Sequence, residues 1–81
     1  MAQRRVVISG AAGLHARPAA ELARLAQAHA GGIRISAGGA SVDAASVLAV
    51  MGLTLERGEQ VVLHADGPDA ESVLERAAAL L

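Results

Sequence analysis

The sequence predicts an α+β fold, an open-faced two-layer sandwich whose elements follow the order βαββαβα. Four short segments have the alternating or β-branched pattern of strands, and three have apolar residues at helical spacing. Glycine or proline stands at most of the boundaries between them. With 81 residues the chain has room for one hydrophobic core, so residues 1–81 are expected to form a single domain.

The first half of the chain is expected to form a strand, a helix and the two strands of a hairpin. Residues 4–9 contain the β-branched run Val6-Val7-Ile8, and Gly10 then opens a loop that lasts to residue 13. Residues 16–30 are expected to be helical and to end at Gly31-Gly32. The apolar stripe of this helix comprises Ala19, Leu22, Ala23 and Ala26. Residues 33–37 and 40–42 are the strands of a hairpin that turns at Gly38-Gly39.

The second half supplies two helices and the last strand. Asp43 and Ser46 are both candidate caps for a short helix over residues 47–52. In this helix we expect Leu48 to belong to the core, and Val47 and Met51 to meet partners. After a turn at residues 56–59, residues 60–65 alternate as a strand that Asp66-Gly67-Pro68 ends. Residues 69–81 are expected to form the last helix, with Ala70, Val73, Leu74, Ala77 and Leu80 on one stripe.

The direction of the chain in each strand then predicts the order of the strands in the sheet. A helix connects the first strand to the second, so these two run parallel, and the fourth strand runs opposite to both and fills the slot between them. The expected four-stranded sheet therefore has the order 1-4-2-3 with every neighbouring pair antiparallel. Three helices are expected to cover one face and to leave the other open.

Composition excludes several classes of protein. The chain has no Cys, so neither a disulfide framework nor a thiolate metal site is possible, and its three scattered His residues make no recognisable metal site. Apolar runs such as residues 47–50 are too short for a membrane span, and no signal peptide is visible, so a cytoplasmic protein is expected. The chain has no Lys and no aromatic residue, side chains that commonly bind a nucleic acid strand, so a nucleic acid is not the expected partner. No cofactor is expected.

The formal net charge is only −1, but the charge is unevenly distributed along the chain. Residues 1–42 carry five arginines against the single acid Glu21, whereas residues 43–81 carry seven acids against Arg57 and Arg76. A surface with Arg17 and Arg24 is therefore expected to steer an acidic protein partner.

The residues that indicate chemistry are Gly13-Leu14-His15-Ala16-Arg17-Pro18-Ala19, where the loop meets the first helix. If His15 lies at the N-cap, the backbone amides of Ala16 and Arg17 have no partner within the helix and form an anion site. Pro18 suits the first turn because it lacks an amide, and the Arg17 guanidinium matches phosphate oxygens. A neutral His15 ring beside the helix dipole can attack phosphorus. The product is a labile N–P bond, as a phosphoryl carrier requires.

At these residues the sequence resembles HPr, the family of histidine-containing phosphocarriers of the bacterial phosphoenolpyruvate-dependent sugar phosphotransferase system. The resemblance extends to the Gly38-Gly39 hairpin and to the segment Ser46-Val47-Leu48-Ala49-Val50-Met51-Gly52-Leu53, and covers nearly the whole chain. The chain departs from the family pattern in two respects: it stops at Leu81, slightly earlier than many members, and Gln27, Ala45 and Ala49 replace cationic side chains found in some members.

The resemblance implies that His15 is phosphorylated at Nδ1 by Enzyme I and donates to EIIA domains, with Arg17 and the Ala16 amide binding the phosphate. The protein would then be a monomeric carrier that needs partner enzymes, not an enzyme itself. Ala20, Arg24, Val47 and Met51 are the candidate docking residues. Ser46 is a candidate site for an HPr kinase/phosphorylase, although a helix cap alone also explains a serine there.

Two alternatives remain open at the level of sequence. The chain could be a regulatory binding module that uses the same surface without phosphotransfer. It could also be a carrier in a nitrogen-regulatory or dihydroxyacetone-kinase phosphorelay.

Overall fold

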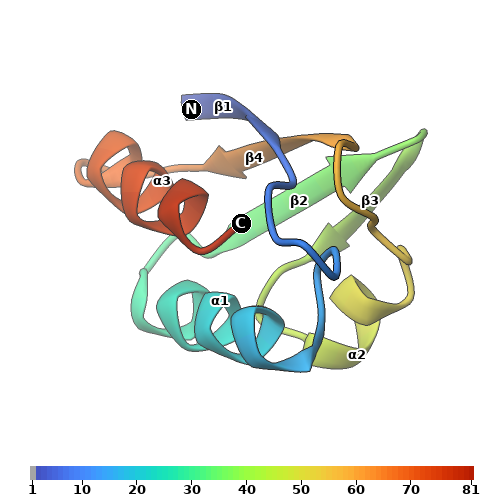
Figure 1. The fold of residues 1–81 in the computed structure, drawn as a ribbon. Helices are drawn as coiled ribbons and strands as arrows, with labels where there is room; N and C mark the ends of the chain where they lie inside the picture. The colour runs from blue at the N-terminus through green and yellow to red at the C-terminus, as the bar shows by residue number, and fades with distance from the viewer. Residues whose placement is uncertain (1) are drawn as a thin grey trace.

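The structure is a computed structural model that describes residues 2–81. Its elements follow the predicted order βαββαβα (Figure 1). They are β1 (Ala2–Val7), α1 (Ala16–Ala28), β2 (Ile33–Ala37), β3 (Ala40–Asp43), α2 (Val47–Met51), β4 (Gln60–Ala65) and α3 (Ala70–Ala79).

The four strands form one sheet in the order β1-β4-β2-β3, which confirms the predicted topology. All three neighbouring pairs are antiparallel. The register places Val6 opposite Val61 and Ile35 opposite Leu63. Thus β4 lies at the centre of the sheet although it is the last strand in the sequence, and it joins the two halves of the chain.

One face of the sheet carries the core. In β4 the side chains of Val61, Leu63 and Ala65 are at most 3% exposed, while the intervening residues lie on the opposite face. The three helices lie on the core side of the sheet, as Figure 1 shows. Their buried residues include Leu22 of α1, Val50 of α2 and Leu74 of α3. The arrangement is the expected two-layer sandwich with one open face.

The first strand differs from its predicted bounds of 4–9. It begins at Ala2, because pairing with β4 extends to Ala65, and it ends at Val7 opposite Gln60. Ser9 leaves the sheet, since its amide donates instead to the carbonyl of Leu81 at 2.9 Å. This contact brings the end of the chain beside the loop that follows β1, as Figure 1 also shows.

The helix ends also differ slightly from prediction. α1 ends at Ala28, and His29 follows as its cap with an extended backbone. The ring Nε2 of His29 donates to the carbonyl of Asp66 at 2.6 Å, a contact that ties the end of α1 to the β4–α3 loop. α3 is one residue shorter than predicted at its start and two at its end. Among residues 2–81, no helix is long and apolar enough to cross a bilayer.

The expectation that Leu48 belongs to the core is wrong. Leu48 is 86% exposed, whereas Val50 is fully buried. Each residue of an α-helix turns by about 100°, so two positions two residues apart lie on nearly opposite faces. The sequence pattern of α2 is apolar on almost every side, so it did not indicate which of the two faces the sheet.

Candidate functional site

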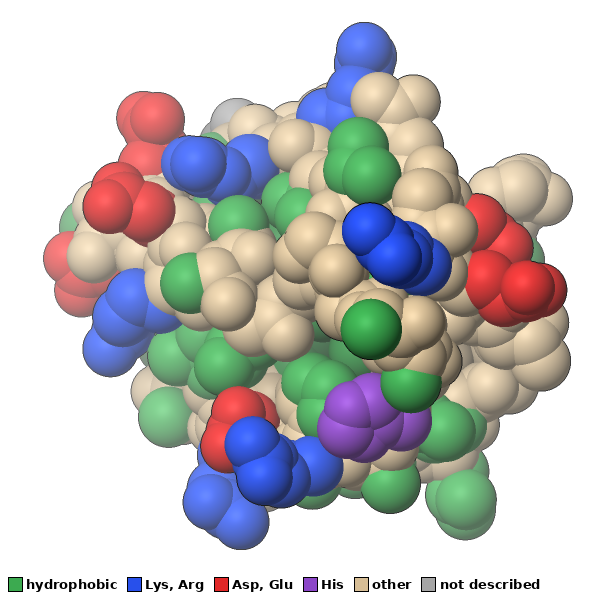
Figure 2. All heavy atoms as spheres, viewed as in Figure 1, with side chains coloured by type: hydrophobic (Ala, Val, Ile, Leu, Met, Phe, Trp, Pro, Cys, Tyr) green, Lys and Arg blue, Asp and Glu red, His purple; other side chains and the backbone are tan. Residues whose placement is uncertain are grey.

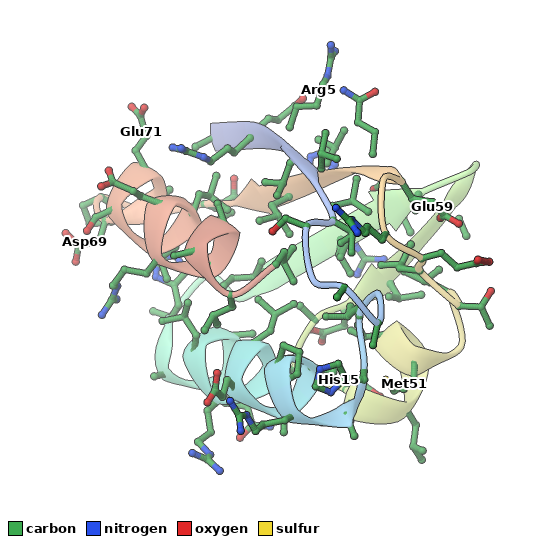
Figure 3. All side chains as sticks on the ribbon, viewed as in Figure 1. Arg5, His15, Met51, Glu59, Asp69 and Glu71 are labelled. Atoms are coloured by element: carbon green, nitrogen blue, oxygen red, sulfur yellow. The ribbon has the colours of Figure 1, made fainter. Side chains whose placement is uncertain are left out.

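His15 is the N-cap of α1, where sequence analysis placed it. Its backbone is extended, with φ −113° and ψ −174°, and its side chain makes no capping hydrogen bond. The ring is exposed. Figure 3 shows it between the start of α1 and α2, near Met51. Figure 2 shows a histidine at the same place on the surface, with hydrophobic side chains around it and basic side chains to its lower left and above it. The ring is therefore accessible to another molecule.

The loop before His15 is held by the segment that precedes β4. The Gly13 amide donates to the Gly10 carbonyl at 2.9 Å, and the Leu14 amide donates to the Leu55 carbonyl at 3.0 Å. Gly13 has φ +74°, and a Cβ atom there would lie 2.7 Å from the Leu55 oxygen and 3.0 Å from the Glu56 Cα. Because both are backbone atoms, they offer no rotamer that relieves the contact. The position of His15 thus depends on close backbone packing that only glycine permits.

The first turn of α1 presents amides to the His15 side of the helix. The Ala19 amide donates to the His15 carbonyl at 3.2 Å, which is the first hydrogen bond of the helical ladder. The amides of Ala16 and Arg17 come before this hydrogen bond and have no acceptor within the helix, and Pro18 has no amide hydrogen. No acidic residue stands in this turn. Two backbone donors and the positive end of the helix dipole therefore lie beside the His15 ring, a suitable environment for an anion.

Arg17 adds an exposed cation to this site. Its side chain forms no hydrogen bond or ion pair with any other residue in the range 2–81. Its guanidinium is therefore not committed to a carboxylate of the chain and can bind an incoming anion with two parallel hydrogen bonds.

Ser46 caps α2, as predicted. Its Oγ accepts a hydrogen bond from the Ala49 amide at 3.1 Å. Asp43, the other candidate cap, instead accepts from the Ala45 amide at 2.9 Å and so stabilises the turn before the helix. The Gln27 side chain donates to the Ala45 carbonyl at 3.1 Å and links α1 to this turn. The start of α2 is thereby held against α1.

The four candidate docking residues lie on the two helices that flank His15. Ala20, Val47 and Met51 are partly buried, and Arg24 is exposed. Leu48, which sequence analysis assigned to the core, is the most exposed large hydrophobic residue of α2 and belongs with this surface instead. The structure thus brings His15, apolar side chains of α2 and cations of α1 to one side of the molecule.

Comparison with known proteins identifies the family. The family model described as "PTS HPr component phosphorylation site" matches residues 2–81. The chain belongs to the HPr family. The phosphocarrier protein HPr of Streptomyces coelicolor is 49% identical over 82 residues, which cover 100% of this chain and 88% of the relative. The crystal structure of HPr from Bacillus anthracis superposes with a TM-score of 0.90 at 36% identity and covers 99% of this chain and 95% of that one.

Membership in the HPr family assigns a general role as a phosphocarrier of the phosphotransferase system. A further solved structure, described as an HPr dimer from Thermoanaerobacter tengcongensis, has a TM-score of 0.72 at 31% identity and covers 99% of this chain and 92% of that chain. The family therefore includes proteins that crystallise as dimers.

Sequence analysis missed the part played by residues 53–59. In this segment the Leu55 carbonyl accepts a hydrogen bond from the Leu14 amide, and the Gly58 amide donates to the Ile8 carbonyl at 2.8 Å. Residues 53–59 therefore lie against the loop that carries His15. Thr54 within it has φ +50°, a left-handed conformation unusual for a residue with a branched Cβ. No local pattern in the sequence indicates a contact between residues 40 positions apart.

The remaining two histidines have structural contacts that the sequence did not indicate. His29 holds the Asp66 carbonyl, as described above. The Nε2 atom of His64 lies 3.2 Å from Ser36 Oγ, across two paired strands on the open face of the sheet.

Proposed function

We propose that His15 accepts a phosphoryl group at Nδ1 from phospho-Enzyme I, which obtains it from phosphoenolpyruvate, and donates it to EIIA domains in sugar uptake. The observation that carries this proposal is the exposed, unbonded ring of His15 at the N-cap of α1, beside the first-turn amides.

The proposed transfer uses few groups. The lone pair of Nδ1 attacks phosphorus, an Nδ1–P bond forms, and the bond from phosphorus to the donor breaks with its electron pair leaving on the donor. Nδ1 is the ring nitrogen nearer to the main chain, so a phosphoryl group on it lies closer to the amides of Ala16 and Arg17 than one on Nε2. These amides and the Arg17 guanidinium stabilise the negative oxygens during transfer.

The same site explains why the group can leave again. The amides of α1 and Arg17 bind the phosphoryl oxygens through hydrogen bonds, and the surrounding surface remains open to solvent. Among residues 2–81, no segment covers the His15 side chain, which is exposed. The protein is accordingly proposed to act as a carrier and not as an enzyme, and each partner supplies the rest of its own active site.

Docking is proposed to use Ala20 and Arg24 of α1 together with Val47, Leu48 and Met51 of α2. The apolar residues supply area that a partner removes from water, and Arg24 steers an acidic partner towards it. Ser46 is proposed as a site for an HPr kinase/phosphorylase, because its hydroxyl is exposed at the edge of this surface.

A cytoplasmic monomer is proposed as the working form. In support, β1 pairs with β4 of the same chain along its whole length, so the sheet is complete within one molecule. Size-exclusion chromatography with light scattering tests this, and a dimer at micromolar concentration would contradict it.

Phosphorylation with defined partners tests the function. The protein is incubated with phosphoenolpyruvate and Enzyme I, and intact mass is measured. The proposal predicts one added phosphate that is lost in mild acid and that transfers to an EIIA domain. A protein that binds Enzyme I but gains no phosphate would be a regulatory binding module. Transfer to nitrogen-regulatory or dihydroxyacetone-kinase partners in place of EIIA would assign it to one of those phosphorelays.

A further inference from the structure

A second surface lies on the other side of α1 from α2, in a groove between α1 and α3. The groove is shallow and open to solvent, has a volume of about 360 Å³, and is lined by Glu21, Arg24, Leu25, Arg76 and Leu80. Figure 2 shows hydrophobic side chains between these two helices, with acidic and basic groups along the rims. We name these five residues the α1–α3 groove.

The floor of the groove is apolar. Leu25 and Leu80 are partly buried and pack against the hydrophobic core, but each keeps part of its side chain accessible from the groove. A partner that fills the groove with an aliphatic side chain removes this remaining apolar area from water, which is favourable.

The rims of the groove carry two arginines and one acid. Arg24 and Arg76 are exposed, and neither forms a hydrogen bond or an ion pair with another residue between 2 and 81. The single acid, Glu21, leaves an excess of positive charge. Arg17 lies seven residues before Arg24, two turns along α1, and extends this charge by roughly 10 Å. Carboxylates on a ligand therefore find guanidinium partners on both walls of an apolar trough.

The groove shares Arg24 with the surface proposed for phosphotransfer, but its α3 wall lies apart from the α2 part of that surface. The apolar docking residues Val47, Leu48 and Met51 belong to α2. Arg76 lies within α3 and Leu80 caps its end, and α3 is on the opposite side of α1 from α2 in Figure 1. A ligand in the groove leaves the α2 side free.

We propose that the α1–α3 groove binds an acidic amphipathic helix of a protein partner, which inserts leucine-like side chains between Leu25 and Leu80 and pairs its carboxylates with Arg24 and Arg76. A helix laid into a groove between two helices presents apolar anchors at i and i+4, a spacing that matches an apolar floor between charged rims. This interaction does not require His15 and goes beyond the proposed function.

The test uses a fluorescein-labelled peptide of 15 residues with Leu at i, i+4 and i+8 and Glu at most other positions, titrated with the whole protein. The proposal predicts saturable binding that weakens as salt rises. Amide shifts in NMR spectra should concentrate on α1 and α3. A peptide with Lys in place of each Glu should not bind, nor should a peptide with Ser in place of each Leu.

Two charge-reversed variants separate the groove from general electrostatics. Arg76→Glu should weaken binding at least about tenfold, because it replaces an attraction by a repulsion beside the peptide. Arg5→Glu carries the same change of charge on β1, far from the groove in Figure 3, and should change binding less than twofold. Thermal melts of both variants should match the parent, since both residues are exposed.

Three results would overturn the proposal: no binding up to millimolar protein, equal weakening by both variants, or amide shifts confined to α2 and His15. The last would assign the peptide to the phosphotransfer surface. Phosphorylation of the parent protein by Enzyme I is measured separately. If the parent gains no phosphate, the proposed function is contradicted, but the peptide-binding result still stands.

Discussion

Replacing Gly13 by alanine tests whether the loop that carries His15 is held as the structure indicates. Gly13 has φ +74°, and an added Cβ would lie 2.7 Å from the Leu55 oxygen and 3.0 Å from the Glu56 Cα. A left-handed backbone with a Cβ costs about 1–2 kcal/mol. Relieving contact with fixed backbone atoms costs about 1–3 kcal/mol more.

The expected total loss for Gly13→Ala is about 3 kcal/mol of unfolding free energy. For a domain of this size that corresponds to a fall of about 12–24 °C in Tm. Gly32→Ala is the matched control. Gly32 has nearly the same backbone angle, φ +69°, but nothing lies within 4 Å of its added Cβ. Gly32→Ala should therefore lose only the cost of a left-handed backbone with a Cβ, about 1 kcal/mol of unfolding free energy, which lowers Tm by about 4–8 °C.

Differential scanning calorimetry on the parent and both variants measures this difference. Because relief of the contact must shift the loop or the 53–59 segment, Gly13→Ala should also slow phosphoryl transfer, whereas Gly32→Ala should not. Equal Tm values for the two variants would refute the reasoning, since the backbone angle alone would then account for both. Normal transfer by a strongly destabilised Gly13→Ala would show that the loop does not position His15.

Three further predictions, which use four substitutions, test other parts of the molecule. Arg17→Lys should transfer phosphate measurably more slowly than the parent at unchanged charge, because a single ammonium cannot bind two phosphoryl oxygens in parallel; rapid-quench kinetics measure the rate. Ser46→Asp should keep or slightly raise Tm while weakening association with Enzyme I by about five- to 150-fold, or roughly 1–3 kcal/mol, as measured by calorimetric titration, because its charge adjoins the apolar docking surface. Val50→Ala should lose about 2 kcal/mol in denaturant unfolding, whereas exposed Leu48→Ala should lose less than about 0.5 kcal/mol.

Each of these has an outcome that would contradict its reason. Equal transfer rates for Arg17→Lys and the parent would show that Arg17 contributes only its positive charge and not the geometry of its guanidinium. A large drop in the Tm of Ser46→Asp would show that the carboxylate cannot replace the hydroxyl as a cap. Equal losses at positions 48 and 50 would contradict the orientation of α2.

The sheet order was predictable from the sequence because chain connectivity leaves few choices. A helix between the first two strands makes them parallel, and only the fourth strand can then fill the slot between them. The burial of α2 was not predictable in the same way. Its five residues are all apolar, so periodicity could not distinguish Leu48 from Val50, and packing against the sheet decided between them.

The placement of His15 at the start of α1 was also predictable, because Gly13, His15 and Pro18 each suit a loop-to-helix junction. What holds that junction in place was not. The Leu14 amide bonds the Leu55 carbonyl, and Gly13 lies against Glu56, through contacts between segments about 40 residues apart. Such contacts depend on the assembled sheet, and no local pattern encodes them.

The central claim is tested most directly by mapping the phosphate. The parent and His15→Ala are each incubated with phosphoenolpyruvate and Enzyme I, and intact mass and phosphorus NMR are recorded. The account predicts that the parent gains one phosphate, with the phosphorus shift of an Nδ1 phosphohistidine, and that the folded His15→Ala variant gains none. Phosphorylation of His15→Ala on His29 or His64 would contradict it.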